Sequence, residues 1–444
     1  MQDYCDIFSG KKITVMGLGL LGRGLNDALF LIKSGAIVTV TDLKNRQQLA
    51  PSLEKLKDLP VRVKLGGHDP ADFVETDMVL RNADVPKSSP FLKLARDHGV
   101  PVEMDESLFC KYFTGRVIGI TGTRGKTTTT EIAFRVLKHV QPRTFLAGNI
   151  VGLATLPLLK DVRQGDTVIM ELSSWQLQGF HEAKISPNAS VFTNIYPDHL
   201  NRYSGMEDYI QDKKAIYMYQ RGDDFCLFNG DQDSTRALYA EAPAGKDFFS
   251  YSDAPVDLDL KIPGAHNISN VAAAWRLVTK LGIEDVIVRK VVENFRGVEH
   301  RLEPLGAKKG IQFVNDSTST TPVAGIMALK SMKAERIFLI AGGADKKLDL
   351  KRFAEEASRR AHKIALLEGT ATPNLYSDLV SFGAKNKIVG VFDDLKKAVL
   401  CVYDQASVGD VILLSPACAS FGLFMNEFHR GECFKSIVKE IISS

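Results

Sequence analysis

The chain has 444 residues, about three times the roughly 150 residues of a typical domain, so about two to four compact domains are expected. Hydrophobic residues make up 45% and charged residues 25%, a composition that excludes disordered, collagen-like and membrane-embedded chains. The net charge is +3 and the basic pairs are scattered, so we expect neither nucleic acid nor a membrane as a partner. No apolar run has the length of a membrane span, and a cytoplasmic location is expected.

The first predicted elements are a strand, a glycine turn, a helix and a second strand. The β-branched run 13–16 leads into Gly17, a helix is predicted over residues 20–34 with Gly35 as its stop, and a strand over residues 37–42. This order is typical of the first βαβ unit of a parallel α/β sheet.

The turn in this unit has the G-x-G-x-x-G spacing of a dinucleotide-binding loop. Gly17, Gly19 and Gly22 supply the glycines, and Asp42 ends the next predicted strand. Bare glycine backbone lets a diphosphate approach a helix N-terminus. NAD(P) and other nucleotide diphosphates both fit this pattern.

Further along the chain, a predicted strand over residues 117–120 leads into a phosphate loop, which has the sequence GITGTRGKTT over residues 119–128. Consecutive backbone N–H groups would surround a β-phosphate, Lys126 would neutralise β and γ oxygens, and the Thr127 hydroxyl would bind Mg²⁺. A strict Walker pattern has glycine where this chain has Ile120, but the variant spacing still supplies the loop. ATP or GTP binding is therefore predicted.

Two later apolar runs deliver polar groups at their ends. Residues 167–171 end in Glu171, a candidate Mg²⁺ ligand, and residues 191–195 precede Asp198 and His199. A solvent-facing strand-end glutamate and a structural histidine are the simpler alternatives.

The last domain is predicted to begin near His300 and to alternate strands with helices. Its predicted strands cover residues 311–314, 337–341, 363–367, 387–392 and 410–414, and its closing helix covers residues 422–442. We divide the chain into domains over residues 1–102, 103–298 and 299–444.

Six ordered motifs resemble those of the Mur ligases. They are the 119–128 loop, ELSSWQL from Glu171, DHLNRY from Asp198, GAHNISN from Gly264, His300-Arg301, and LSPACASF from Leu414. Two of them, ELSSWQL and LSPACASF, are similar to those of family members that add D-glutamate. The resemblance implies an α/β protein of three domains: an N-terminal Rossmann-like domain, a central P-loop mononucleotide-binding domain and a C-terminal Rossmann-like domain.

The resemblance also implies a reaction. An ATP-dependent ligase would activate the alanyl carboxylate of UDP-MurNAc-L-Ala as an acyl phosphate, which the amine of D-glutamate then attacks, in peptidoglycan assembly. The products would be ADP and phosphate. A monomer is expected.

The resemblance further implies the residues that hold ATP and Mg²⁺. Catalysis would rest on Lys126, Glu171, His199 and Lys213, and the metal on Thr127, Glu171, His199 and Lys213, the last as a carbamylated lysine. Lys214 beside it leaves that register open. The set implied to hold ATP is Gly122, Thr123, Arg124, Gly125, Lys126, Thr127, Thr128, Asn267, Asn270, Arg301 and Asp316.

For the substrates, the resemblance implies three groups of residues. Asn149 and His199 would contact the muramoyl-alanine part. The uridine diphosphate would lie at the first glycine loop near Leu20, Leu21, Asp42 and Lys44, and D-glutamate would be held by Thr320, Lys346, Ser420 and Phe421. Lys347 is an alternative to Lys346.

Three positions depart from the family pattern. Thr318 stands where many relatives have Lys, Arg124 where many have Asn, and Asp84 where Gly is common. We hypothesise that Arg124 restores the charge lost at Thr318. Three other functions stay open: a nicotinamide-dependent oxidoreductase on the Gly17 loop, a family member that adds another amino acid, and a P-loop switch without synthesis.

Overall fold

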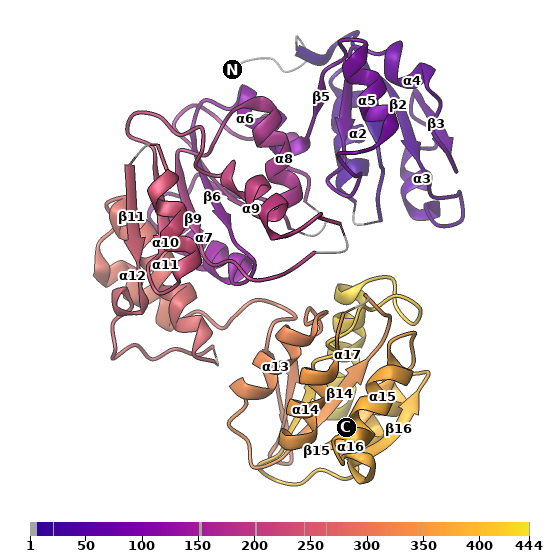
Figure 1. Ribbon diagram of the computed structural model, residues 1–444, viewed down its shortest axis with the longest axis vertical. Helices are drawn as coiled ribbons and strands as arrows, with labels where there is room; N and C mark the ends of the chain where they lie inside the picture. The colour runs from indigo at the N-terminus through magenta and orange to yellow at the C-terminus, as the bar shows by residue number, and fades with distance from the viewer. Residues whose placement is uncertain are drawn as a thin grey trace. The chain divides into compact units, whose positions relative to one another are not determined.

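The computed structural model describes residues 7–20, 22–150, 153–199, 202–243, 245–262, 264–346 and 348–443. Within them the chain forms three separate sheets with helices between most successive strands, one sheet in each predicted domain (Figure 1). The predicted α/β class with three sheet-bearing domains is confirmed, whereas the exact domain boundaries stay a prediction. No helix in these residues is long and apolar enough to cross a membrane.

The first sheet is parallel throughout and has the order β3-β2-β1-β4-β5. Its strands are β1 Lys12–Met16, β2 Ile37–Asp42, β3 Val61–Leu65, β4 Met78–Arg81 and β5 Val102–Glu103, and its helices are α2 Arg23–Lys33, α3 Ala50–Leu56, α4 Ala71–Val74 and α5 Pro90–Asp97. The strand order reverses at β1, which places the glycine loop at the edge where α/β sheets bind ligands. Helix α2 begins at Arg23 and not at Leu20, because the glycine loop extends to Gly22, which has a left-handed φ of 84°.

The second sheet is also parallel, with the order β11-β10-β9-β6-β8-β7. Its strands are β6 Arg116–Thr121, β7 Thr144–Gly148, β8 Thr167–Glu171, β9 Ala189–Phe192, β10 Phe225–Asn229 and β11 Gly245–Phe249. The helices are α6 Asp105–Tyr112, α7 Lys126–Val140, α8 Ser174–Ala183, α9 Met206–Lys214, α10 Asp233–Glu241, α11 His266–Lys280 and α12 Asp285–Glu293, with short 3-10 turns η1 Leu156–Lys160 and η2 Tyr251–Asp253. Since β6, β8 and β9 are neighbours, the polar residues that follow them meet at one edge.

The third sheet has the order β12-β13-β17-β14-β15-β16 and is parallel except for the β12–β13 pair. Its strands are β12 Glu303–Lys308, β13 Ile311–Asn315, β14 Ile337–Gly342, β15 Ala361–Leu367, β16 Ile388–Phe392 and β17 Val411–Leu414. The helices are α13 Pro322–Ser331, α14 Lys351–Arg360, α15 Thr372–Ser381, α16 Leu395–Tyr403 and α17 Glu427–Ser443, with the turn η3 Lys385–Lys387.

Two features of the third sheet differ from the prediction. The edge strand β12 was not predicted, because Pro304 and Gly306 interrupt its strand pattern. Its register with β13 also shifts between these two residues. Helix α17 begins at Glu427 and not at residue 422, because the Asn426 side chain accepts a hydrogen bond of 2.8 Å from the His429 N–H and so caps the helix there.

The three sheets belong to two compact units. One comprises Met1–Val256 and Ser269–Val291, and the other Asp257–Ile268 and Val292–Ser444. In the first unit a single apolar cluster joins residues of both sheets, including Leu31 of α2 and Leu156 of η1. The second unit has apolar clusters of its own on the two faces of its sheet.

Candidate active site

The phosphate loop joins β6 to α7 and depends on glycine at two positions. Gly122 has a φ of 142° and Gly125 a φ of 81°. A Cβ atom would lie 2.0 Å from the Thr193 hydroxyl oxygen at Gly122, and 2.1 Å from the Asn270 amide oxygen at Gly125. The loop is therefore packed against the end of β9 and against α11, and bare backbone N–H groups are left to line it.

Lys126, the first residue of α7, folds over this loop. Its ammonium donates hydrogen bonds to the carbonyl oxygens of Gly122 at 3.0 Å and of Thr123 at 3.1 Å. Thr127 and Thr128 follow in the first helical turn and are half-buried. Arg124 lies in the same loop, and its guanidinium is 3.5 Å from the Asp198 carboxylate. Burial alone would raise the pKa of Asp198, but Arg124 and His199 hold it below its usual value.

Glu171 lies at the end of β8, where it is 2% exposed. Its Oε1 accepts a hydrogen bond of 2.9 Å from the Asn149 amide, and the Asn149 N–H donates to the Glu171 carbonyl at 2.7 Å. Its buried Oε2 has no hydrogen-bond partner in the residues that the structure describes. A buried, partnerless carboxylate oxygen beside a phosphate loop fits a divalent cation.

Lys213 lies near the end of α9, and its side chain reaches the same loop. It is 1% exposed, and its ammonium donates to the Thr121 hydroxyl at 3.2 Å and to the Gly122 carbonyl at 3.0 Å. Burial, and next the positive charge of Lys126, hold the pKa of Lys213 well below its usual value. Lys214 points elsewhere and pairs with Glu241 at 2.5 Å.

His199 lies after β9 among aromatic side chains. Its ring centroid is 4.7 Å from that of Trp175 and 6.3 Å from that of Tyr209. Arg202 belongs to the same cluster of side chains, since its guanidinium carbon lies 4.8 Å from the centroid of the Trp175 ring. His199 has a left-handed φ of 55° and its side chain is 41% exposed, so the imidazole is held at the surface of the site.

The first glycine loop is braced by Asp42. Its Oδ2 accepts the Gly19 N–H at 3.2 Å, and its Oδ1 accepts the Lys44 N–H at 2.9 Å. The Asp42 side chain is therefore engaged with the protein's own backbone. Leu20 is 51% exposed beside the loop, and Leu21 lies outside the described residues.

In the second unit the residues predicted for D-glutamate converge. The Lys346 ammonium donates to the Thr320 hydroxyl at 2.9 Å. A backbone bridge between Ala344 and Ala419 brings the Lys346 loop beside Ser420, whose buried hydroxyl has no hydrogen-bond partner among described atoms. Phe421 is 57% exposed, and Lys347 lies outside the described residues.

Asp316 directly follows β13 in the same unit and is 7% exposed. Its carboxylate accepts the Leu302 N–H at 3.2 Å and the Ser415 hydroxyl at 2.8 Å. Burial raises the pKa of Asp316 to about 7, although these hydrogen bonds and Arg301 act in the opposite direction. Thr318 donates from both its N–H and its hydroxyl to the His300 carbonyl, at 3.1 and 2.8 Å.

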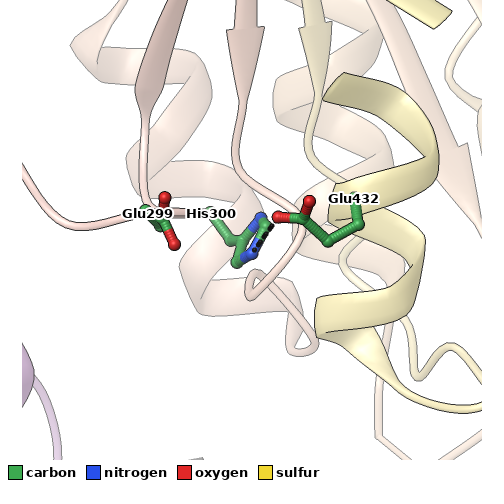
Figure 2. Close-up of side chains that lie close together, drawn as sticks. All are labelled: Glu299, His300 and Glu432. Carbon is green, nitrogen blue, oxygen red and sulfur yellow. Dashed lines mark ion pairs between the residues drawn. The ribbon is translucent and has the colours of Figure 1, made fainter. Parts of the chain in front are cut away.

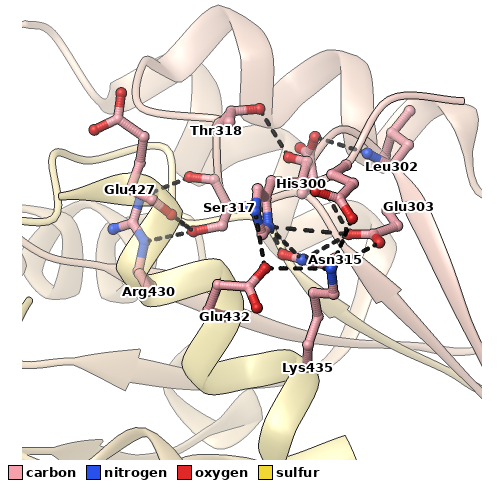
Figure 3. Close-up of polar contacts among 12 residues, drawn as sticks. His300, Leu302, Glu303, Asn315, Ser317, Thr318, Glu427, Arg430, Glu432 and Lys435 are labelled. Atoms are coloured by element: carbon pink, nitrogen blue, oxygen red, sulfur yellow. Dashed lines mark hydrogen bonds and ion pairs between the residues drawn. The ribbon is translucent and has the colours of Figure 1, made fainter. Parts of the chain in front are cut away.

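A buried polar network that was not predicted surrounds these residues (Figure 3). Arg430, fully buried on α17, donates to the Ser317 hydroxyl at 3.0 Å, to the Ser317 carbonyl at 2.8 Å and to the Cys418 carbonyl at 3.3 Å. It therefore ties the segment that precedes Thr318 to the segment that precedes Ser420. A single arginine more than 100 residues away in the chain offers no local signal of this role.

Three groups of metal-ligand type also gather in this unit, namely Glu299, His300 and Glu432 (Figure 2). The Lys435 ammonium lies 3.1 Å from Glu299 and 3.2 Å from Glu432, and 3.5 Å from Glu303. The chain's own lysine thus neutralises the acidic groups, and the cluster holds the start of the third sheet.

The two units therefore each assemble part of the predicted set. The first brings together the phosphate loop, Asn149, Glu171, Lys213 and Asn270. The second brings together Thr320, Lys346 and Ser420, with Arg301 and Asp316 near β13. Asn267 and Asn270 lie three residues apart in α11, on one face of that helix.

Comparison with known proteins follows the same three segments. Residues 11–103 match the model of the Mur ligase MurD-like N-terminal domain, residues 120–253 the Mur ligase middle domain, and residues 300–418 the Mur ligase glutamate ligase domain. A UDP-N-acetylmuramoylalanine–D-glutamate ligase of Roseiflexus sp. (strain RS-1) is 39% identical, over 97% of this chain and 99% of that protein. A ligase of the same name from Borreliella afzelii (strain PKo) is 35% identical, over 98% of each chain.

Solved structures of similar fold are more distant in sequence. The UDP-N-acetylmuramate-alanine ligase of Thermotoga maritima aligns with a TM-score of 0.62 at 20% identity, over 98% of this chain and 99% of that chain. A MurF ligase of the same organism, solved with ADP, aligns with a TM-score of 0.59 at 19% identity, over 99% of this chain and 96% of that chain.

Proposed function

The chain belongs to the Mur ligase family, and from this we propose that it joins D-glutamate to UDP-N-acetylmuramoyl-L-alanine at the expense of ATP. The observation that carries the proposal is that the Lys126 ammonium lies over the phosphate loop, 3.0 Å from the Gly122 carbonyl, while the buried Glu171 carboxylate keeps, among the described residues, a partnerless oxygen for a cation. Phosphoryl transfer to a carboxylate brings two anions together, and the positive charges of Lys126 and of a bound cation lower that barrier.

The reaction proceeds in two steps. A carboxylate oxygen of the alanyl group attacks the γ-phosphorus, the bond from this phosphorus to the β,γ-bridging oxygen breaks, and ADP leaves. The amine of D-glutamate then attacks the carbonyl carbon of the acyl phosphate, loses a proton, and inorganic phosphate leaves as the amide forms. Lys126 would hold the transferred phosphoryl group, and the glycine loop would bind the remaining phosphates through backbone N–H groups.

The residues near the loop fit Mg²⁺. Thr127, Glu171 and His199 would hold it, and the partnerless Oε2 of Glu171 supports this assignment. When bound, the metal neutralises phosphate charge so that the carboxylate can approach.

Lys213 would act as a carbamate. Burial, and next the charge of Lys126, hold the pKa of Lys213 well below its usual value and so favour the neutral amine, which adds to carbon dioxide with loss of one proton. The product carries a negative charge, which suits a residue beside Lys126 and a metal site better than a second buried ammonium does.

The remaining assignments follow the geometry of each loop. Lys346 and Thr320 would hold the carboxylates of D-glutamate with Ser420, and Arg301, Asp316, Asn267 and Asn270 would hold the nucleotide. The first glycine loop would bind the uridine diphosphate. Since Asp42 is engaged with the loop backbone, we assign it to shaping the loop rather than to a nicotinamide ribose. A monomer in the cytoplasm remains our expectation.

The test is phosphate release with Mg-ATP and UDP-N-acetylmuramoyl-L-alanine. D-glutamate, L-glutamate, L-alanine and a diamino acid are added in parallel, and release only with D-glutamate is expected. Release with another amino acid would keep the family and overturn the assignment of the second unit. Slow ATP hydrolysis that no substrate changes would favour a P-loop switch instead.

A further inference from the structure

A hydrogen-bonded chain links the first glycine loop to Glu171. Arg23 is the first residue of α2, directly after Gly22 of that loop. Its Nη2 donates to the Asn149 Oδ1 at 2.9 Å, and the Asn149 Nδ2 donates to the Glu171 Oε1 at 2.9 Å. Arg23 of the first sheet-bearing domain is thus joined through Asn149 to Glu171 of the second domain of the same unit.

The chemistry of the two end groups determines the direction of both hydrogen bonds. A guanidinium only donates and a carboxylate only accepts, so the Asn149 amide must present its oxygen to Arg23 and its nitrogen to Glu171. A charged group at each end strengthens both hydrogen bonds. With Oε1 of Glu171 engaged, Oε2 is the oxygen left for a metal ion.

From this geometry we infer that Arg23 is a positioning residue for the metal site, acting through Asn149 on the orientation of Glu171. The inference rests on the proposed function, because it takes Glu171 as a ligand of Mg²⁺. It adds that the domain expected to bind the UDP-sugar sets the geometry of the metal carboxylate in the other domain of the unit.

The charge of Arg23 has a second effect that the test must separate. Arg23 lowers the pKa values of Asp27, Asp105 and Glu106, three buried carboxyl groups whose pKa values burial raises. Loss of the charge can therefore change stability without any change at Glu171. Arg23→Lys keeps the charge beside these groups but shortens the reach to Asn149, whereas Arg23→Met removes both.

The experiment measures ADP affinity by calorimetry with and without Mg²⁺, and takes the ratio as the contribution of the metal. We expect Arg23→Met to reduce this ratio by roughly fivefold, and Arg23→Lys to reduce it by less, at an unfolding midpoint near that of the unchanged protein. In an Asn149→Ala background, Arg23→Met should change the ratio by less than about twofold, because the path through Asn149 is already cut.

The matched control is Arg96→Met. Arg96 also crosses between the two domains of the first unit, with its Nη2 2.7 Å from the Glu182 Oε1, but does not contact Asn149. In Arg96→Met, the ratio of the ADP affinities with and without Mg²⁺ should match that of the unchanged protein. An unchanged ratio in Arg23→Met, or an equal loss with and without Asn149, would overturn the inference. If the ADP affinity of the unchanged protein is the same with and without Mg²⁺, the metal assignment in the proposed function is overturned instead.

Discussion

At the scale of single residues, the unusual feature is a lysine that shares a carbonyl oxygen with a second lysine. Lys213 reaches Gly122 from 91 positions along the chain, in a place where burial opposes its charge. Burial in that position disfavours the ammonium form, and a neutral amine and the proposed carbamate have different chemical signatures.

Lys213→Arg should lower kcat by about 100-fold, because a guanidinium stays charged and cannot form a carbamate. Lys214→Ala is the control and should keep kcat, since Lys214 pairs with Glu241 away from the loop. ¹³C-labelled bicarbonate should give a carbamate signal in the unchanged protein and in Lys214→Ala, but not in Lys213→Arg. A signal that is lost in Lys214→Ala alone would move the assignment to the neighbouring residue.

Asp316 makes the second unit sensitive to pH. Burial raises the pKa of Asp316 from its ordinary 3.8 to about 7, so the native state holds a proton that the unfolded state releases in this interval. The stabilisation is complete below about pH 4 and is lost as the pH rises through about 7. Asp316→Asn keeps a hydrogen-bonding oxygen and cannot ionise.

We therefore expect Asp316→Asn to unfold with a flatter pH dependence between about pH 4 and 7 than the unchanged protein. Urea unfolding at both pH values, followed for the two proteins side by side, measures the difference. Parallel curves would mean that the Asp316 carboxyl titrates normally in the native state.

At the scale of elements, the phosphate loop depends on contacts with β9 and α11. Gly125 has both a left-handed φ and an Asn270 oxygen where a Cβ would stand, whereas Gly99 has a left-handed φ of 75° with no atom within 4 Å of such a Cβ. Alanine would cause backbone strain at both positions, but it would clash with a neighbouring atom only at Gly125.

Gly125→Ala should weaken ATP binding by at least about tenfold, because the loop must move away from α11. Gly99→Ala should cost only about 1 kcal/mol of stability and leave ATP affinity unchanged. Calorimetric titration of both variants with ATP measures the affinities, and equal affinities would show that the loop yields without loss of its N–H groups.

At the scale of the whole molecule, three sheets belong to only two units. The apolar cluster of the first unit runs through both of its sheets, so these sheets should unfold together. The second unit has separate clusters and should unfold in its own transition.

Differential scanning calorimetry should therefore resolve two transitions. Leu156→Ala, at a side chain with no exposed surface in the first unit, should lower one of them, and Leu375→Ala, equally buried in the second unit, should lower the other. Each substitution should cost about 2–5 kcal/mol. Three transitions, or one variant that shifts both, would contradict this division.

Local sequence patterns suffice to predict the α/β class, the glycine loops and the strands that precede these loops. Residues 37–42 and 167–171 form strands with the bounds expected, because periodicity and glycine placement act over a few neighbouring residues. The motifs that resemble Mur ligases are likewise contiguous. Edge strand β12 escaped detection because edge strands tolerate proline and glycine.

Which side chains meet depends on the packing of segments that are distant in the sequence. Arg23 and Asn149 are 126 positions apart, and Arg430 and Ser317 are 113 apart, so strand order and helix packing alone bring each pair together. The depressed pKa of Lys213 and the raised pKa of Asp316 also depend on burial, which no local pattern specifies. The sequence thus identifies the chemical groups, whereas their charge state and their partners depend on packing between segments that are distant in the chain.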